Sequence, residues 1–212
     1  MRYYFDKWVA NGTFADLNLA LGRELRKLLG REAEPSAAIM DSQSVKTVLY
    51  SADESGYDGA KKIKGRKRFI LVDTLGLLVV VLVTAASVPE RVGGEQLLEQ
   101  AHDSGQRRLE VVYADAGYDG PKLENAVAAT SGWRLECSPR AKKRTLGEGE
   151  VGFVVQQWRW IVERTFGWLN WWRQLSKDYE RKAMNSEAMI QIAMSRMTLR
   201  RLAKLQISQT SP

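Results

Sequence analysis

The chain has almost none of the residues that build thiol, imidazole or zinc chemistry. Among its 212 residues there is one cysteine, Cys137, and one histidine, His102. This excludes an internal disulfide, a zinc finger, a Cys–His nucleophile and a Ser–His–Asp triad. We expect His102 on an exposed helix face and Cys137 as a small core side chain. Any metal ion must be held by carboxylates, which suits Mg²⁺ or Mn²⁺.

We also expect no secretory signal, because no charged segment followed by an apolar core opens the sequence. The longest apolar stretch, residues 69–86, contains Asp73 and Thr74 and turns at Gly76. It therefore predicts the two strands of a hairpin, and we expect no membrane span.

Positive charge is concentrated in the carboxyl-terminal third. Residues 134–212 carry 15 Lys and Arg against 7 Asp and Glu, whereas residues 1–133 carry 17 against 18. The excess indicates a surface for a polyanion, with a solvated basic face as the alternative. Two loops are densely basic, and their side chains repel one another unless phosphates lie between them. The candidate phosphate contacts are Lys61, Lys62, Lys64, Arg66, Lys67, Arg68, Arg140, Lys142, Lys143 and Arg144.

Hydrophobic spacing predicts strands alternating with helices. Residues 1–29 have helical spacing that breaks at Asn11 and Gly12, and the pattern starts without a cap, as if a longer region preceded it. A strand over 36–40, the hairpin, and a strand ending near 114 follow, with a further strand over 133–138. Helices are expected over 94–104, 121–129, 154–175 and 185–205. This order indicates a mixed α/β sheet with helices on its faces. We divide the chain into a residual amino-terminal helical segment (1–35), a catalytic domain (36–206) and a tail (207–212).

The helix over 154–175 has one apolar stripe, which should pack on the sheet. The stripe consists of Trp158, Ile161, Val162, Thr165, Leu169 and Trp172. Trp160, Trp168 and Trp171 lie largely off it. We expect them to pack against the amino-terminal helices, and stacking on nucleic-acid bases is the alternative.

Three acids stand where reactive groups are often found. Asp115 ends a buried strand, the position at which α/β sheets bind ligands, and it is not needed as a helix cap because Asp119, Gly120 and Pro121 follow. Asp41 also follows a strand, with a turn acid as its alternative role. Glu163 projects from the long helix one turn after Arg159, and an ordinary surface ion pair is its alternative role.

Three converging carboxylates repel one another and need cations between them. Two divalent ions would satisfy them and would suit phosphodiester chemistry, in which a water or a 3′-hydroxyl attacks and an oxygen leaves. The basic surroundings would hold nucleic acid.

Four motifs in this order resemble bacterial insertion-sequence transposases of the DDE type, in the IS-four and IS-five grouping. They are AAIMDSQSVKT, GRKRFILVDTLGLLVVVLVTAASVPER, VVYADAGYDG and WIVERTFGWLNWWRQLSKDYER. The resemblance covers essentially the whole chain. It implies a ribonuclease-H-like fold in which Asp41, Asp115 and Glu163 are the catalytic, metal-binding triad for two Mg²⁺ or Mn²⁺ ions. It further implies strand cleavage at transposon ends, transfer of a 3′-hydroxyl onto target DNA, a homo-oligomer on DNA, and a bacterial cytoplasmic, nucleoid-associated location.

The sequence departs from the pattern of that family in two places. The family's tyrosine, arginine, glutamate and lysine signature falls on Gln156, Arg159, Glu163 and Asn170, so only its centre matches. Arg159 is then a candidate phosphate contact, and Asn170 is not. The chain also resembles a catalytic reading frame whose amino-terminal region is missing or separately encoded.

Two other functions remain open from the sequence. One is a catalytically silent fragment that binds DNA or a full-length partner. The other is a glycosidase that uses Asp115 and Glu163 as its acid pair, against which the third acid and the basic surface argue.

Overall fold

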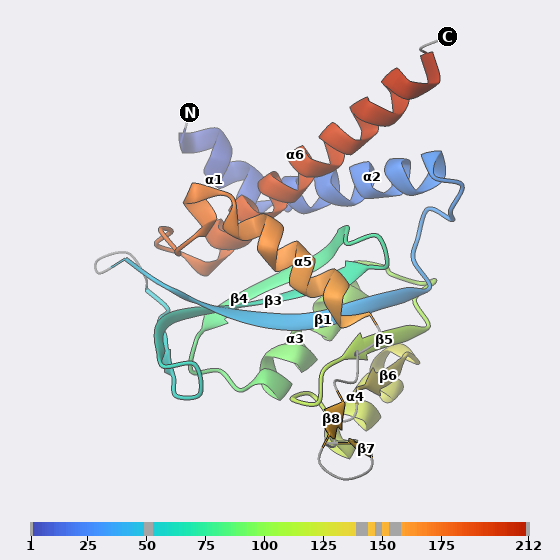
Figure 1. The fold of residues 1–212 in the computed structure, drawn as a ribbon. Coiled ribbons are helices and arrows are strands. Elements are labelled where there is room, and N and C mark those ends of the chain that lie inside the picture. The colour runs from blue at the N-terminus through green and yellow to red at the C-terminus, as the bar shows by residue number, and fades with distance from the viewer. Residues whose placement is uncertain (1, 49–52, 139–143, 147–149, 153–157, 211–212) are drawn as a thin grey trace.

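The computed structural model describes residues 2–48, 53–138, 144–146, 150–152 and 158–210. A twisted sheet forms the centre of the molecule, and helices cover both of its faces (Figure 1). This is the mixed α/β sheet with helices on its faces that the sequence predicts.

The sheet mixes antiparallel and parallel pairs. The central strand β1 pairs antiparallel with β3 and parallel with β5, while β4 pairs antiparallel with β3 and β6 pairs parallel with β5. The short strand β2 pairs with the beginning of β3. The strands are β1 (Ala37–Lys46), β2 (Gly56–Asp58), β3 (Ile63–Asp73), β4 (Leu78–Ala85), β5 (Val111–Ala114) and β6 (Arg134–Cys137). The predicted hairpin is confirmed as β3 and β4.

The helices divide between the two faces, as Figure 1 shows. The first group covers one face and consists of α1 (Arg2–Ala10), α2 (Thr13–Leu28), α5 (Arg159–Asn170), the 3₁₀ turn η1 (Arg173–Leu175) and α6 (Ala183–Thr210). On the other face lie α3 (Glu90–Asp103) and α4 (Pro121–Ser131). A separate small hairpin is formed by β7 (Arg144–Leu146) and β8 (Glu150–Gly152).

Alternation along the strands creates two cores. Met40 and Leu71 face α3 and α4, whereas Ile39 and Ile70 face α5 and α6. All four side chains are fully buried or nearly so, and each such burial stabilises the fold by about 1.5–3 kcal/mol. Since neighbouring strand residues point to opposite faces, the continuous apolar runs in β3 and β4 are needed to fill both cores.

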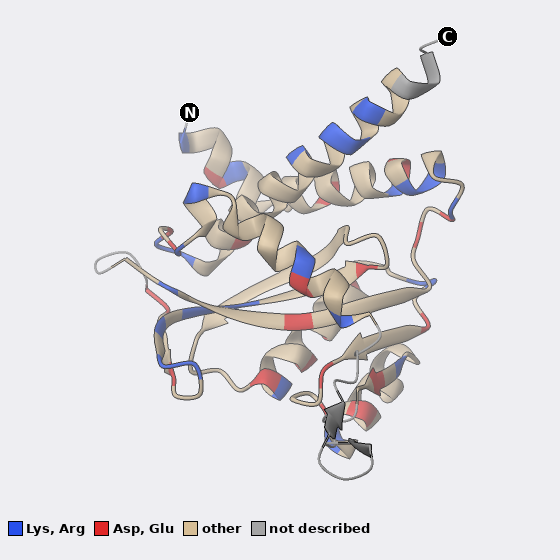
Figure 2. Ribbon diagram, viewed as in Figure 1, with Lys and Arg blue, Asp and Glu red and all other residues tan. Residues whose placement is uncertain are grey.

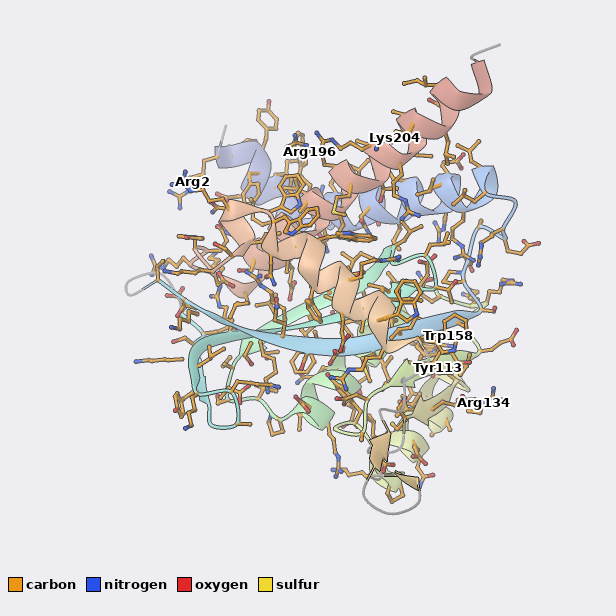
Figure 3. All side chains as sticks on the ribbon, in the orientation of Figure 1. Arg2, Tyr113, Arg134, Trp158, Arg196 and Lys204 are labelled. Carbon is orange, nitrogen blue, oxygen red and sulfur yellow. The ribbon has the colours of Figure 1, made fainter. Side chains whose placement is uncertain are left out.

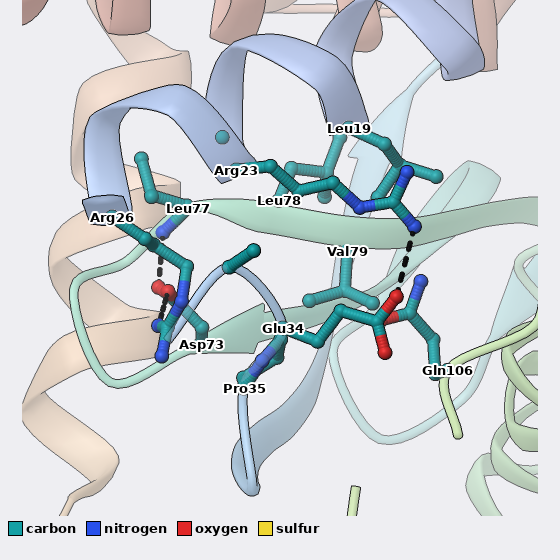
Figure 4. A pocket seen from close by; sticks show the side chains of 12 residues that line it. Leu19, Arg23, Arg26, Glu34, Pro35, Asp73, Leu77, Leu78, Val79 and Gln106 are labelled. Carbon is teal, nitrogen blue, oxygen red and sulfur yellow. Dashed lines mark hydrogen bonds and ion pairs between the residues drawn. The ribbon is translucent and has the colours of Figure 1, made fainter. Parts of the chain in front are cut away.

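The amino-terminal helix α2 is bound to the sheet by buried polar contacts. Asn18 Nδ2 donates to the main-chain carbonyl of Leu78 at 2.8 Å, and Arg26 forms an ion pair with Asp73 in the turn between β3 and β4. Figure 4 shows this ion pair in the small pocket between α2 and β4. These contacts make α2 part of the layered fold.

The buried stripe of the long helix is confirmed at Ile161, Val162, Thr165 and Leu169. The packing expected for the other tryptophans is wrong for Trp160 and Trp171, which are 53% and 86% exposed. The reason is that α1 and α2 pack on α6 and the sheet, so they leave the outer side of α5 uncovered. Trp160 and Trp168 instead hold the guanidinium of Arg164, at 4.7 and 4.6 Å from their ring centroids.

Candidate active site

Asp41 lies in the middle of β1, opposite Ile70 of β3. The expectation that it follows the strand is wrong, because pairing with β3 carries β1 on to Lys46. The pairing between β1 and β5, by contrast, ends at Ile39 and Tyr113. Asp41 lies two residues after Ile39, and Asp115 lies two residues after Tyr113, just past the end of β5. The parallel register therefore places the two carboxylates side by side where β5 leaves the sheet.

The surroundings of Asp41 disfavour its ionised form. Burial raises the pKa of Asp41 from its ordinary value of 3.8 to about 7. The Ser42 N–H, which donates to Asp41 Oδ1 at 2.7 Å, lowers this pKa, as does the Arg159 guanidinium, whereas the Asp115 and Glu90 carboxylates raise it. Near neutral pH both forms are therefore populated, and a bound cation would favour the carboxylate.

Asp115 has a local structural contact in addition to its place in the site. Its Oδ1 accepts a hydrogen bond from the Gly117 N–H at 2.7 Å, which is an Asx-type turn. The cap of α4 differs from the sequence expectation, since the N-cap is Gly120 and no side chain caps the helix, although Pro121 begins it as expected. The turn uses only one oxygen of Asp115, and Oδ2 points to Arg159.

Arg159 connects Asp115 with Glu163. Its Nη1 lies 3.7 Å from Asp115 Oδ2, and its Nε lies 2.9 Å from Glu163 Oε1. The predicted i to i+4 pair on the helix is thus present, and it also reaches the end of β5. The guanidinium supplies the positive charge between the two acids in this arrangement.

The start of α5 is anchored next to these acids. Trp158, which precedes the helix, adopts a left-handed backbone conformation with φ of 75°, which costs a non-glycine residue about 1–2 kcal/mol. Its ring stacks on Tyr113 of β5, with centroids 5.9 Å apart (Figure 3). This contact holds the first turn of α5 over the end of β5, and it thereby places Arg159 beside Asp115.

Two groups at this site are absent from the sequence prediction. The Glu90 carboxylate, in the first turn of α3, raises the pKa of Asp41. The pKa of the buried Tyr118 hydroxyl is itself raised, first by burial and then by the Asp41, Glu90 and Asp115 carboxylates. Pro89 could have predicted that Glu90 lies in the first turn of a helix, because proline is favoured at helix beginnings. Tyr118 carried no signal, since it lies in a Gly-Tyr-Asp-Gly turn that occurs twice in the chain.

The acids do not form a closed metal cage. Within the ranges that the structure describes, no group of three or more His, Cys, Asp or Glu side chains is arranged to hold a metal ion. Asp41 and Asp115 are adjacent, whereas Glu163 is linked to them through Arg159. The donor atoms are nevertheless all carboxylate oxygens, the ligands that Mg²⁺ and Mn²⁺ prefer.

The first basic loop divides into exposed and buried residues. Lys61, Lys62 and Lys64 are exposed, but Arg66, Lys67 and Arg68 are buried in β3. The expected phosphate contacts of these last three are corrected here, because the protein itself uses their charged groups. Lys67 Nζ donates to the Val88 carbonyl, and Arg68 donates to the carbonyls of Leu175 and Lys177.

Arg66 is the most enclosed of the three. Its guanidinium pairs with the Asp178 carboxylate at 3.2 Å, donates to the Ser186 hydroxyl, and donates further to main-chain carbonyls around residues 54, 180 and 181. The side chains of Arg66 and Asp178 are fully buried. Arg66 therefore joins the sheet to the segment that precedes α6.

The candidates of the second loop, Arg140, Lys142, Lys143 and Arg144, lie outside the described side chains.

No helix in the described part of the chain is both long enough and apolar enough to cross a membrane.

His102 is exposed, as predicted, and Cys137 is half-buried against the core of α3 and α4.

Comparison with known proteins identifies the family of the chain. The transposase DDE domain family matches residues 32–198. A putative transposase for insertion sequence element IS402 from Burkholderia cepacia is 31% identical over 125 residues, which cover 56% of this chain and 56% of that protein. The chain thus spans about half the length of this curated relative. Among solved structures, the Mos1 transposase paired-end complex with left transposon end matches 61% of this chain and 43% of that chain, with 11% identity and a TM-score of 0.33. Because the family match extends over most of its length, this chain belongs to the transposase DDE domain family.

Proposed function

We propose that the chain catalyses metal-dependent DNA strand cleavage and strand transfer of an insertion sequence. Asp41, Asp115 and Glu163 are the proposed catalytic residues. One observation supports this function most directly. Asp41 of β1 and Asp115 at the end of β5 lie side by side, and Arg159 links Asp115 to Glu163 of α5. All three acids belong to the part of the chain that matches the transposase DDE domain.

The proposed cofactor is a pair of Mg²⁺ or Mn²⁺ ions held by these carboxylates. When bound, such ions supply activation of a water or 3′-hydroxyl and stabilisation of the leaving oxygen. Asp41 then has to be ionised, and Glu163 has to exchange the Arg159 guanidinium for the cation. The freed Arg159 is placed to pair with a phosphate oxygen of the DNA, because it remains anchored in the first turn of α5.

The proposed DNA contacts outside the site are three exposed lysines: Lys61 and Lys62 in the turn between β2 and β3, and Lys64 at the beginning of β3. Figure 2 shows Lys and Arg at this turn and along the outer half of α6. Arg196 and Lys204, labelled in Figure 3, belong to that half of α6 and are exposed. Separated basic groups of this kind suit a polyanion that runs along the protein surface.

The partners remain proposals at the level of the whole assembly. They are transposon ends and target DNA, a second copy of the chain on that DNA, and a separately encoded amino-terminal segment. We also retain residues 36–206 as the proposed catalytic domain.

The glycosidase alternative is not retained, because the family match is to a transposase domain and Arg159 occupies the space between its two proposed acids.

The test is cleavage of DNA that carries the inverted repeats flanking the gene, in the presence of Mg²⁺. We expect Asp115→Asn to lower the rate by at least about a thousandfold, since loss of one metal ligand removes several kcal/mol of transition-state stabilisation. The matched control is Asp119→Asn, an exposed acid four residues later, which should cleave at the wild-type rate. Full activity of the Asp115 variant would refute the assignment. Salt-sensitive DNA binding by the wild-type chain without cleavage would favour the silent fragment instead.

A further inference from the structure

Glu90 lies beside Asp115, across the turn that follows β5. A methyl group placed on Gly117 would lie 2.4 Å from Glu90 Oε2 and 2.9 Å from Asp115 Oδ1. The two oxygen atoms therefore flank the same point above the turn. Gly117 is not among the described glycines with positive φ, so a side chain at this position would conflict with the end of the Glu90 side chain and not with the backbone conformation.

The position of Glu90 in the fold has an ordinary explanation, but its side-chain direction does not. An acid in the first turn of α3 is stabilised by the helix dipole by about 0.3–1 kcal/mol when its side chain lies near the helix end. That interaction does not require the carboxylate to approach another acid. Placing Glu90 next to Asp115 instead costs repulsion, and the same pair faces Asp41.

Tyr118 supplies a second, independent observation. Its side chain is fully buried, with the ring packed against Gly94 in the same core as Met40. Its Oη makes no hydrogen bond of good geometry among the described residues. The Ser42 side chain, which lowers the pKa of the hydroxyl through a weaker hydrogen bond, and the Asp41, Glu90 and Asp115 carboxylates are its polar neighbours. A buried hydroxyl that is so poorly paired costs up to about 1–3 kcal/mol, and its place among three carboxylates points to an acceptor that is not part of the chain.

We propose that Glu90 is a fourth carboxylate ligand of the site: Glu90, Asp41 and Asp115, which are not arranged for a metal ion as they stand, would turn together toward a divalent cation, and the Tyr118 hydroxyl would donate to a water of that cation. This inference rests on the proposed function, because it concerns the same site. It places cation binding on the α3 side of Asp115, whereas Glu163 approaches from the α5 side. Hard cations such as Mg²⁺ and Mn²⁺ take six oxygen ligands and usually retain several waters, which leaves room for a water bonded to Tyr118.

The experiment measures Mn²⁺ binding to the full chain without DNA, by calorimetry and by the electron paramagnetic resonance signal of free Mn²⁺, with Mg²⁺ as competitor. We expect Glu90→Gln to weaken Mn²⁺ binding at least tenfold and Tyr118→Phe to weaken it two- to fivefold. Glu99→Gln removes the same charge from the exposed side of α3 and should bind Mn²⁺ as the wild type does. Circular dichroism and thermal melting establish that each variant is folded, so that weaker binding reports the site.

The outcomes separate this inference from the proposed function. If Asp115→Asn loses Mn²⁺ binding while Glu90→Gln retains wild-type affinity, the role of Glu90 is refuted and the metal site remains. If the wild-type chain binds no Mn²⁺, or if Asp115→Asn binds it normally, both proposals fail. Loss of binding in Glu90→Gln together with wild-type DNA cleavage would support the cation site and refute its part in catalysis.

Discussion

Asp41 should make the metal-free protein less stable as the pH rises. In the unfolded chain this carboxyl ionises at its ordinary pKa of 3.8, whereas burial and the neighbouring acids raise its pKa to about 7 in the fold. Between these values the folded state binds more protons than the unfolded state, so the free energy of unfolding falls with increasing pH. At about 1.36 kcal/mol per pKa unit, the full difference corresponds to about 4 kcal/mol above pH 7. Because Asp41 is only partly shielded from water, we expect about 2 kcal/mol.

The variant Asp41→Asn isolates this effect. Its amide oxygen can still accept from the Ser42 N–H, but it cannot ionise. Urea unfolding in EDTA should therefore show that the stability of the variant relative to wild type increases by about 2 kcal/mol between pH 4 and pH 8. Glu187, whose pKa burial also raises to about 7, titrates in both proteins, so its contribution cancels in the comparison.

The control for this prediction is Asp103→Asn, which removes a charge from an 84% exposed side chain. It should leave the pH dependence unchanged. A difference between wild type and Asp41→Asn that stays constant from pH 4 to pH 8 would refute the reasoning. Addition of Mg²⁺ at pH 8 should stabilise the wild type more than the variant, because only the wild type retains the carboxylate for the cation.

Three further variants test the packing around the site. Asp178→Asn should lower the free energy of unfolding by about 3–5 kcal/mol, because it leaves the Arg66 guanidinium buried without its counter-charge; urea unfolding measures it. Gly65→Ala should lower it by about 3 kcal/mol or more by the same assay, since its methyl group would lie 2.0 Å from a main-chain oxygen of β1. Tyr118→Phe should leave stability unchanged or raise it by about 1 kcal/mol in EDTA, as thermal melting would show, because the hydroxyl it removes makes no hydrogen bond of good geometry among the described residues.

The first two of these variants have a matched control in the same chain. Asp53→Asn breaks the exposed pair with Arg181 and should cost less than about 1 kcal/mol. Gly59→Ala adds a methyl group with no atom within 4 Å and should be nearly neutral. If Asp178→Asn were as mild as Asp53→Asn, the buried ion pair would not join the sheet to the segment before α6. A marked loss of metal-free stability in Tyr118→Phe would show that the hydroxyl has a partner within the protein.

Much of the fold follows from local patterns in the sequence. The apolar runs of β3 and β4 with the turn at Gly76, the break at Asn11 and Gly12, and the stripe of α5 are set by the side-chain periods of strands and helices, which neighbouring residues determine. Asp115 could be placed at a strand end for the same reason. The extent of β1 could not, because Asp41 continues in a strand only through its pairing with β3.

Only the tertiary structure decided which charges are available for function. In the sequence, Arg66 and Arg68 are indistinguishable from the neighbouring lysines of the same basic loop, and their burial depends on carbonyl groups and a carboxylate more than 100 residues away. Glu90 and Tyr118 likewise acquire their proposed roles from the turn at Gly117 that brings them to Asp115. A sequence pattern reports the period of the element that carries a residue, whereas burial, ion pairing and close approach depend on which distant segments the fold places next to it.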